Sequence, residues 1–290
     1  MQKIGFIGTG VMGAAMITNL LDAGYPVTVY NRTKVKADAV VAHGATWADT
    51  PAEVTRQADI IITIVGYPKD VEEVYFGKDG IFSGAHAKQI IIDMTTSTPA
   101  LATKIANYAQ AHDIAALDAP VSGGDIGAKN GTLTIMVGGS ETAYHAVEPI
   151  FTVLGHQINL FGQAGAGQHT KMANQIMIAA TMIGLSEMLV YAKAANLDLQ
   201  KVLMTLSSGG ADNWSMDNYV PRILQGDFQP GFYAKHLLKD LRIALDGANE
   251  MHLDLPGTKL AERLYTKLSE EMHLGDEGTQ ALVKLWASFQ

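Results

Sequence analysis

The chain has 290 residues, of which 48% are hydrophobic and 17% charged, with 29 glycines and no cysteine; this composition is typical of a compact protein of two domains. The net charge of −8, without a block of basic residues, disfavours a nucleic-acid or anionic-membrane partner. The lack of cysteine excludes disulfides and thiolate metal sites and fits a cytoplasmic location, and the nine histidines show no metal-ligand spacing, so we expect no metal.

Short β-branched runs alternate with helical patterns from Lys3 to Gly162, which is typical of successive β-α-β units. We expect seven strands: Lys3–Ile7, Val27–Tyr30, Ile60–Val65, Gln89–Asp93, Ala115–Ala119, Leu133–Val137 and Gln157–Leu160. Several of these strands lack polar alternation, as strands covered by helices on both faces do. The fold class we predict is α/β, with a Rossmann-type, doubly wound parallel sheet in residues 1–162.

The pattern after Gly162 is almost purely helical, and we predict an all-α domain over residues 163–290, joined by a long interdomain helix at about 168–195. Shorter helices are expected near 198–206, 213–224, 235–251, 255–272 and 279–289. A helix that is apolar on most faces must be buried, as a spine against a second subunit or as the central helix of a monomeric bundle. Its most apolar part, Ile176–Leu185, is too short to cross a bilayer, so we expect no membrane partner.

A glycine-rich motif follows the first strand and opens a helix. It reads Gly8-Thr9-Gly10-Val11-Met12-Gly13, which matches the G-x-G-x-x-G fingerprint of dinucleotide-binding β-α-β units. The glycines allow a tight turn, close approach of a pyrophosphate and close packing of helix on strand, and free amides at the helix start would hold the pyrophosphate. We predict these six residues to bind a dinucleotide, and the motif alone leaves flavin and nicotinamide open.

The second strand ends in Asn31-Arg32-Thr33, where a site specific for NAD normally has an acidic residue. An arginine can pair with the 2′-phosphate of NADP, and no carboxylate repels that phosphate here. We therefore predict that these three residues favour NADP over NAD. A solvated basic turn is the alternative, mainly for Lys34 and Lys36.

Two further segments carry polar groups suited to chemistry. The loop Asp118-Ala119-Pro120-Val121-Ser122-Gly123-Gly124 offers a hydroxyl and glycine amides to a carboxylate, although such loops are often plain turns. Lys171 lies one turn into the apolar helix, where a lysine is costly without a function, and Asn174 and Gln175 share its side of that helix. A lysine extending to solvent at a helix start is the alternative for Lys171.

These motifs together resemble the β-hydroxyacid dehydrogenases, which include 3-hydroxyisobutyrate dehydrogenase, tartronate semialdehyde reductase and glyoxylate/succinic semialdehyde reductases. The resemblance covers nearly the whole chain and includes Phe232 with Lys239-Asp240. It implies that Lys171 is the general acid/base and that Ser122, Gly123 and Gly124 hold the substrate carboxylate. The residues it places in or around the cofactor site are Val65, Thr96, Phe232, Lys239 and Asp240. Many members have Asn four residues after the lysine, where this chain has Gln175, so the substrate contact lies with Asn174 or Gln175.

We therefore predict an NAD(P)-dependent oxidoreductase that transfers hydride between NADP, or NAD, and a small 3-hydroxy acid or semialdehyde, as a cytoplasmic homo-oligomer, a dimer or a tetramer. A non-catalytic NADPH-binding sensor or scaffold could share the fold, but it would need neither Lys171 nor Ser122. A decarboxylating 6-phosphogluconate-like dehydrogenase is the enzyme alternative. Its members are much longer and have a His-Asn pair after the lysine, and this sequence has neither feature.

Overall fold

The computed structural model describes residues 1–286 and 289. The chain separates into two compact units, Met1–Lys171 (unit 1) and Met172–Gln290 (unit 2), and the boundary falls inside one helix, α9 (Ala166–Ala194). Unit 1 contains a mainly parallel sheet between helices, and the described part of unit 2 is helical. The predicted fold class is confirmed.

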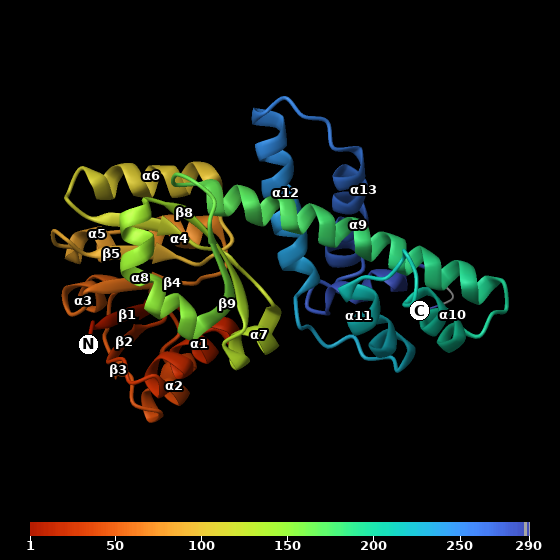
Figure 1. Cartoon of the computed structure of the whole chain (residues 1–290), viewed down its shortest axis with the longest axis horizontal. Helices are drawn as coiled ribbons and strands as arrows, with labels where there is room; N and C mark the ends of the chain where they lie inside the picture. Colours follow the sequence, from red (N-terminus) through yellow and green to blue (C-terminus); the bar gives the residue numbers. More distant parts are fainter. Residues whose placement is uncertain (287–288, 290) are drawn as a thin grey trace. The chain divides into compact units, whose positions relative to one another are not determined.

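The sheet of unit 1 has nine strands among the described residues, in the order β3-β2-β1-β4-β5-β6-β8-β7, with β9 beside β8 (Figure 1). Their bounds are β1 Ile4–Ile7, β2 Val27–Tyr30, β3 Thr46–Trp47, β4 Ile60–Thr63, β5 Ile90–Asp93, β6 Ala115–Asp118, β7 Val121–Ser122, β8 Leu133–Gly139 and β9 Gly155–Leu160. Strands β1 to β6 pair in parallel, whereas β8 runs antiparallel to β6 and β7. The six parallel strands therefore end at one edge of the sheet, which is where open α/β sheets bind ligands.

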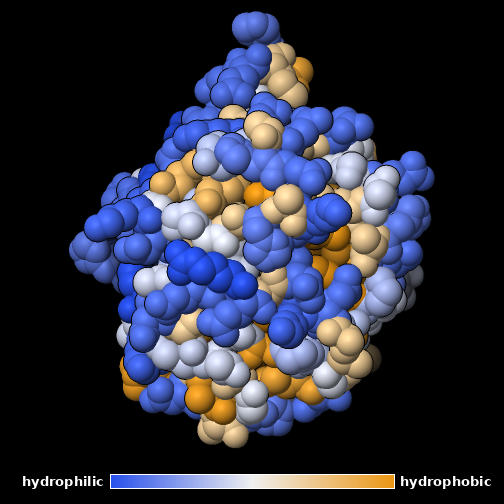
Figure 2. All heavy atoms as spheres, turned by 90° about the vertical axis from the view of Figure 1, so that its left-hand side faces the viewer, coloured by the Kyte–Doolittle hydropathy of each residue, from blue (hydrophilic) through white to orange (hydrophobic). Residues whose placement is uncertain are grey.

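Both faces of this sheet are covered. The helices of unit 1 are α1 Val11–Asp22, α2 Asp38–Ala42, α3 Pro51–Arg56, α4 Pro68–Phe76, α5 Ile81–Gly84, α6 Pro99–Gln110, α7 Gly124–Asn130 and α8 Glu141–Leu154, with a 3₁₀ turn at Lys34–Ala37. On β4, Ile60 and Ile62 enter a core with α1 and α8, while Ile61 enters a second core with α3, α4 and α6. Figure 2, which looks onto the left-hand side of Figure 1, shows apolar residues interspersed among hydrophilic ones on the outer surface.

All seven predicted strands are present, with ends that differ by at most two residues. Two strands were not predicted, β3 and β7, because a run of two residues carries no readable periodicity. The predicted parallel sheet is present in β1 to β6, whereas β8 runs antiparallel to β6 and β7. The connection from β6 through β7 to β8 contains only the short helix α7, and short connections join antiparallel neighbours.

The described part of unit 2 consists of the rest of α9 and four further α-helices: α10 Leu199–Leu206, α11 Trp214–Leu224, α12 Ala234–Glu250 and α13 Pro256–Thr266. A π turn follows at Lys267–Glu271, and residues Thr279–Leu285 form a 3₁₀ helix rather than the start of the predicted helix at 279–289. Residues 287 and 288 of that prediction lie outside the described residues. Leu189, Val220, Leu237 and Tyr265 are fully buried in the core of this unit.

Helix α9 has 29 residues and is not buried all round, since Met177 is 67% and Tyr191 77% exposed. Over the described ranges it alone is long and apolar enough to cross a membrane, a test that core helices also pass. The expectation that its apolar part is too short was therefore wrong as an argument about length, because the apolar residues continue beyond 176–185. The absence of a membrane partner stays a prediction.

Candidate active site

The predicted site residues of unit 1 lie at the carboxyl ends of the parallel strands. β1 leads into Gly8–Gly13, β2 into Asn31–Thr33, β4 into Val65, and β5 into Thr96. β6 leads through Ala119 and Pro120 to Ser122 at the end of β7. Parallel pairing of β1 to β6 thus brings these separate segments to one edge of the sheet.

The glycine-rich loop leaves an open helix start. A side chain at Gly8 would lie 2.1 Å from the carbonyl oxygen of Ile64, and one at Gly13 would lie 2.0 Å from that of Gly8, whereas a Cβ on Gly10 meets nothing within 4 Å. In the part of the chain that the structure describes, no side chain caps α1 at Gly10, and the buried hydroxyl of Thr9 has no hydrogen-bond partner. Open space, free amides and an unpartnered hydroxyl fit the pyrophosphate of a dinucleotide.

Asn31 ties the second strand to this loop. Its Oδ1 accepts a hydrogen bond from the Thr9 amide at 3.0 Å, and its Nδ2 donates to the Thr33 carbonyl at 2.9 Å. The side chain of Asn31 therefore shapes the loop in addition to whatever it offers a ligand.

Arg32 forms an ion pair with a residue that sequence reasoning missed. Its Nη1 lies 3.1 Å from Oδ1 of Asp70 in α4, and its side chain is 78% exposed. The other oxygen of Asp70 accepts the amide of Tyr67 at the start of α4. Asp70 as the third residue of a helix that begins with Pro68 is a recognisable capping pattern, but its pairing with Arg32, 38 positions away, required the fold.

The loops after β4, β5 and β7 present the remaining predicted residues of unit 1. The amide of Val65 donates to Oγ1 of Thr95 at 3.0 Å, beside the half-buried Thr96. Gly123 and Gly124 have φ angles of 128° and 65°, which L-residues with side chains rarely adopt. Their amides and the partly exposed Ser122 form a short polar turn at the start of α7.

Lys171 is the last residue of unit 1 and is 5% exposed. The start of its helix is held by Asp118, whose carboxylate accepts the amides of Gly165 at 2.7 Å and Gln168 at 2.8 Å. Burial raises the pKa of Asp118, and these amides act in the opposite direction. The lysine is thus fixed close after a helix start that is attached to the end of β6.

Unit 2 brings four of its predicted residues together. Gln175 is fully buried, and its Nε2 donates to Oδ2 of Asp240 at 2.6 Å, while its Oε1 accepts Nδ2 of Asn174 at 2.7 Å. Lys239 pairs with the other oxygen of Asp240 at 3.0 Å. Phe232 packs against the core of this unit. Both ends of the Gln175 amide are therefore engaged inside unit 2, whereas Asn174 is only half-buried.

Known proteins resemble both parts of the chain. Residues 3–162 match the protein-family model described as the NAD binding domain of 6-phosphogluconate dehydrogenase, and residues 165–286 match that described as NAD-binding of NADP-dependent 3-hydroxyisobutyrate dehydrogenase. The chain is 50% identical to probable 3-hydroxyisobutyrate dehydrogenase-like 1 of Arabidopsis thaliana, over 97% of this chain and 84% of that protein. It is 38% identical to 2-hydroxy-3-oxopropionate reductase of Escherichia coli, over 91% and 90%.

A solved structure, 3-hydroxyisobutyrate dehydrogenase of Mycobacterium tuberculosis with L-serine, superimposes with a TM-score of 0.91 at 29% identity, covering 98% of this chain and 99% of that one. The resemblance inferred from the motifs is thereby confirmed over nearly the whole chain. Across residues 1–286 and 289, no three His, Asp or Glu side chains gather as metal ligands would.

Proposed function

Because the chain belongs to the family of 3-hydroxyisobutyrate dehydrogenase-type, NAD(P)-dependent oxidoreductases, we propose that it interconverts a small 3-hydroxy acid and its semialdehyde, prefers NADP and uses Lys171 as general acid/base. The observation that carries the proposal is a lysine with 5% exposed surface, five residues past the first residue of a helix whose start a buried carboxylate anchors at the ligand-binding edge of the sheet. Such a lysine is costly to the fold unless it has a chemical role.

The residues of unit 1 suit a nicotinamide dinucleotide, which when bound supplies or accepts the hydride. The amides at the start of α1 and the hydroxyl of Thr9 would hold its pyrophosphate. In the reducing direction Lys171 donates a proton to the carbonyl oxygen of the semialdehyde as that oxygen gains negative charge, and in the oxidising direction it removes the hydroxyl proton.

The preference for NADP rests on Arg32. Arginine has five N–H donors in a planar fork, and Asp70 occupies only the Nη1 end, so that a phosphate oxygen can still pair with the guanidinium. Asp70 limits the orientations of an otherwise exposed side chain. The neutral Asn31, engaged with Thr9 and Thr33, places no carboxylate on the end of β2 itself, and the charge of the Asp70 carboxylate is paired with Arg32.

The substrate class follows from the turn at Ser122. One hydroxyl and two glycine amides form a grip of the size of a single carboxylate, and two relatives, 2-hydroxy-3-oxopropionate reductase and 3-hydroxyisobutyrate dehydrogenase, are named as enzymes of short hydroxy acids. We assign the amide contact to Asn174, because Asn174 and Asp240 already engage both ends of the buried Gln175. The part of the chain that carries Lys171 matches the 3-hydroxyisobutyrate dehydrogenase model, which favours this reaction over a decarboxylating 6-phosphogluconate-like one.

Initial rates over a panel of short aldehyde acids and 3-hydroxy acids, each with NADP(H) and NAD(H), test the proposal. We expect turnover of at least one acid pair, with higher kcat/KM for NADP. Cofactor binding without turnover of any member would support a non-catalytic binding protein, and release of carbon dioxide from a phosphorylated sugar acid would support the decarboxylating alternative.

A further inference from the structure

A buried glutamine joins the helix of Lys171 to the loop of Thr96. Gln168 is fully buried, its Nε2 donates to the Thr95 carbonyl at 2.7 Å, and its Oε1 accepts the Ser97 amide at 2.9 Å. These two backbone groups lie on either side of Thr96. On α9, Lys171 follows Gln168 by three residues and therefore lies on the same side of the helix.

A buried carboxylate makes the second connection. Asp118 is 3% exposed and accepts the amides of Gly165 and Gln168, and its own backbone continues, after three residues, to Ser122. The start of α9 is closely packed there, since a Cβ on Gly167 would lie 2.3 Å from the Met136 carbonyl oxygen. Asp118 thereby fixes the helix start relative to the strand that leads to the predicted carboxylate grip.

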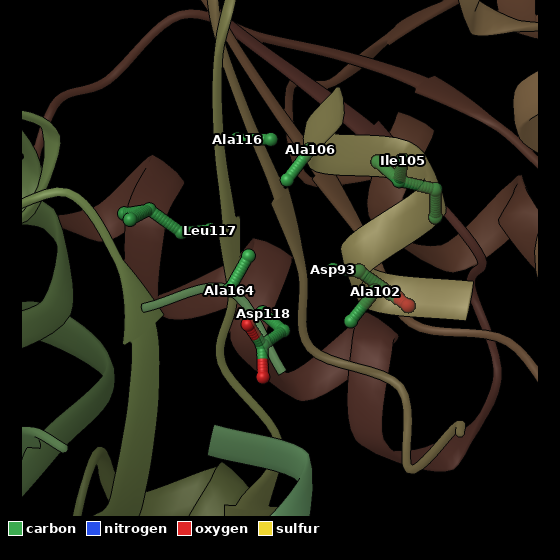
Figure 3. Close-up of a pocket in the computed structure, with 8 residues that line it drawn as sticks. All are labelled: Asp93, Ala102, Ile105, Ala106, Ala116, Leu117, Asp118 and Ala164. Atoms are coloured by element: carbon green, nitrogen blue, oxygen red, sulfur yellow. The ribbon is translucent and has the colours of Figure 1, made fainter. Parts of the chain in front are cut away.

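Apart from Asp93, the cavity beside Asp118 is lined by apolar residues. Asp93 and Asp118 are register partners on β5 and β6, and both border a small cavity lined otherwise by Ala102, Ile105, Ala106, Ala116, Leu117 and Ala164 (Figure 3). In such surroundings an unmade hydrogen bond is costly. The bonds of Asp118 and Gln168 are therefore expected to hold the helix in one position.

We propose that Gln168 is a positioning residue, which sets Lys171 and Thr96 at one separation, with Asp118 fixing the same helix turn to β6. This proposal rests on the proposed role of Lys171. Misplacement of a reacting group by about 1 Å can cost about 100-fold in rate. Loss of the two Gln168 bonds is thus expected to lower kcat by a larger factor than it weakens cofactor binding, because Gln168 bonds on either side of Thr96 and not to the glycine-rich loop that holds the pyrophosphate.

The test uses Gln168→Met and a matched control, Gln89→Met. Gln89 is also buried in unit 1, accepts the His86 amide and donates to the carbonyls of Thr55 and Ala58, but it precedes β5 at the opposite edge of the sheet. We expect Gln168→Met to lower kcat about 10- to 100-fold, with a much smaller change in the Kd for NADPH and a larger solvent deuterium isotope effect on kcat, because proton transfer becomes limiting.

Gln89→Met should lose similar stability in urea and keep wild-type kcat and isotope effect. The proposal would be overturned if the two variants had equal kcat. It would also be overturned if the decrease in kcat of Gln168→Met were fully explained by the fraction of that variant that is unfolded. If Gln168→Met does not fold, Gln168→Asn keeps a shorter amide and should show a lowered kcat with the raised isotope effect; wild-type values would equally overturn it. Lys171→Met separates the two hypotheses: if it turns over normally, the proposed role of Lys171 fails, and if it is inactive while Gln168→Met is normal, only the positioning proposal fails.

Discussion

Among the described residues, two long helices begin at a pair of glycines, α1 at Gly8 and Gly10 and α9 at Gly165 and Gly167. The surroundings of these two helix starts differ. α1 begins at Gly10, where a Cβ would meet nothing within 4 Å, and the following Val11 is 63% exposed. α9 begins after Gly165, where Asp118 accepts two amides and the backbone of β8 lies against Gly167. The first start is open, and the second is closed by the protein itself.

Both starts satisfy the same physical requirement. The free amides and the dipole at a helix start attract an anion, and glycines let that anion approach. At α1 the anion has to be a ligand, whereas at α9 it is an internal carboxylate. A glycine-rich helix start therefore predicts an anion, and the tertiary structure decides whether a ligand or a side chain provides it. Under the proposed function, the closed start holds Lys171 in position, and the open start is left for the cofactor.

The largest expected effect tests whether the helix with the closed start serves catalysis. Lys171→Met should lower kcat by roughly 10²–10⁴-fold, the usual contribution of a general acid or base, with nearly unchanged affinity for NADPH, since the phosphates bind at α1. Steady-state rates and fluorescence titration with NADPH measure the two quantities. Near-wild-type turnover would remove Lys171 from the mechanism.

A third helix, α7, also begins at glycines, and Ser122 directly precedes them. A substitution of Ser122 tests whether this helix start, like that of α1, binds the anionic group of a ligand. A hydrogen bond to a charged group contributes about 1.5–3 kcal/mol, so Ser122→Ala should lower kcat/KM for acid substrates about 10- to 150-fold. An aldehyde that lacks the carboxylate should be affected much less. Equal losses with both kinds of substrate would mean that this turn is structural.

Arg32, the basic residue beside the open start of α1, should select NADP over NAD. Arg32→Ala should weaken NADP by about 2 kcal/mol, or roughly 30-fold, and leave NAD unchanged. Asn31→Asp should shift preference further toward NAD, and it should also cost stability because Nδ2 of Asn31 donates to the Thr33 carbonyl. The ratio of kcat/KM for NADP and NAD measures the effect. A wild-type preference for NAD, or an unchanged ratio in both variants, would favour a plain basic turn.

Substitutions of the glycines test most directly whether the start of α1 is open and the start of α9 is closed. Gly10→Ala should fold normally, because its Cβ enters empty space, and should raise the Kd for NADPH about tenfold, or about 1.4 kcal/mol. Gly167→Ala should instead lower the free energy of unfolding by about 1–3 kcal/mol, as overpacking does. Urea unfolding and NADPH titration of both variants suffice. Destabilisation by Gly10→Ala, or none by Gly167→Ala, contradicts the distinction.

The last effect concerns stability alone. It compares Asp118, which accepts amides at the start of α9, with its neighbour Asp93, which lies at no helix start. Burial raises the pKa of Asp93 from 3.8 to about 6, against hydrogen bonds from Thr95 and Thr63 and with Asp118 nearby. Because the folded state binds this proton more tightly than the unfolded state, ionisation of Asp93 lowers stability as pH rises from about 4 to 6. Asp93→Asn keeps an oxygen for both donors and should be more stable than wild type above pH 6, by on the order of 2 kcal/mol.

Below about pH 4 the stabilities of Asp93→Asn and wild type should converge, because both side chains are then neutral. Chemical unfolding at several pH values measures the difference, and Tyr75, which bonds Thr63 on the same network, should stay protonated throughout since burial raises its pKa well above 10. A pH-independent difference between the two proteins would contradict the assignment.

The sequence by itself determined the parts of this protein that depend on neighbours along the chain. Unbroken apolar runs such as Ile60–Thr63 identified the strands, and Gly8, Gly10 and Gly13 identified the dinucleotide loop, because strand, turn and helix start occur there within a few residues. The position of Lys171 in an apolar helix was equally readable. Each of these signals depends on residues that are close in the sequence, so the tertiary structure positions these segments without altering their interpretation.

Only the tertiary structure decided the polar contacts between residues distant in the sequence. The bonds of Asp118 with Gly165 and Gln168 span 47 and 50 positions, that of Gln175 with Asp240 spans 65, and that of Gln168 with Ser97 spans 71. Buried polar groups must find partners, but the sequence does not indicate which partner, because that choice depends on strand order and on close backbone approach. The requirement that buried polar groups be hydrogen-bonded makes such contacts obligatory, and the fold determines which residues form them.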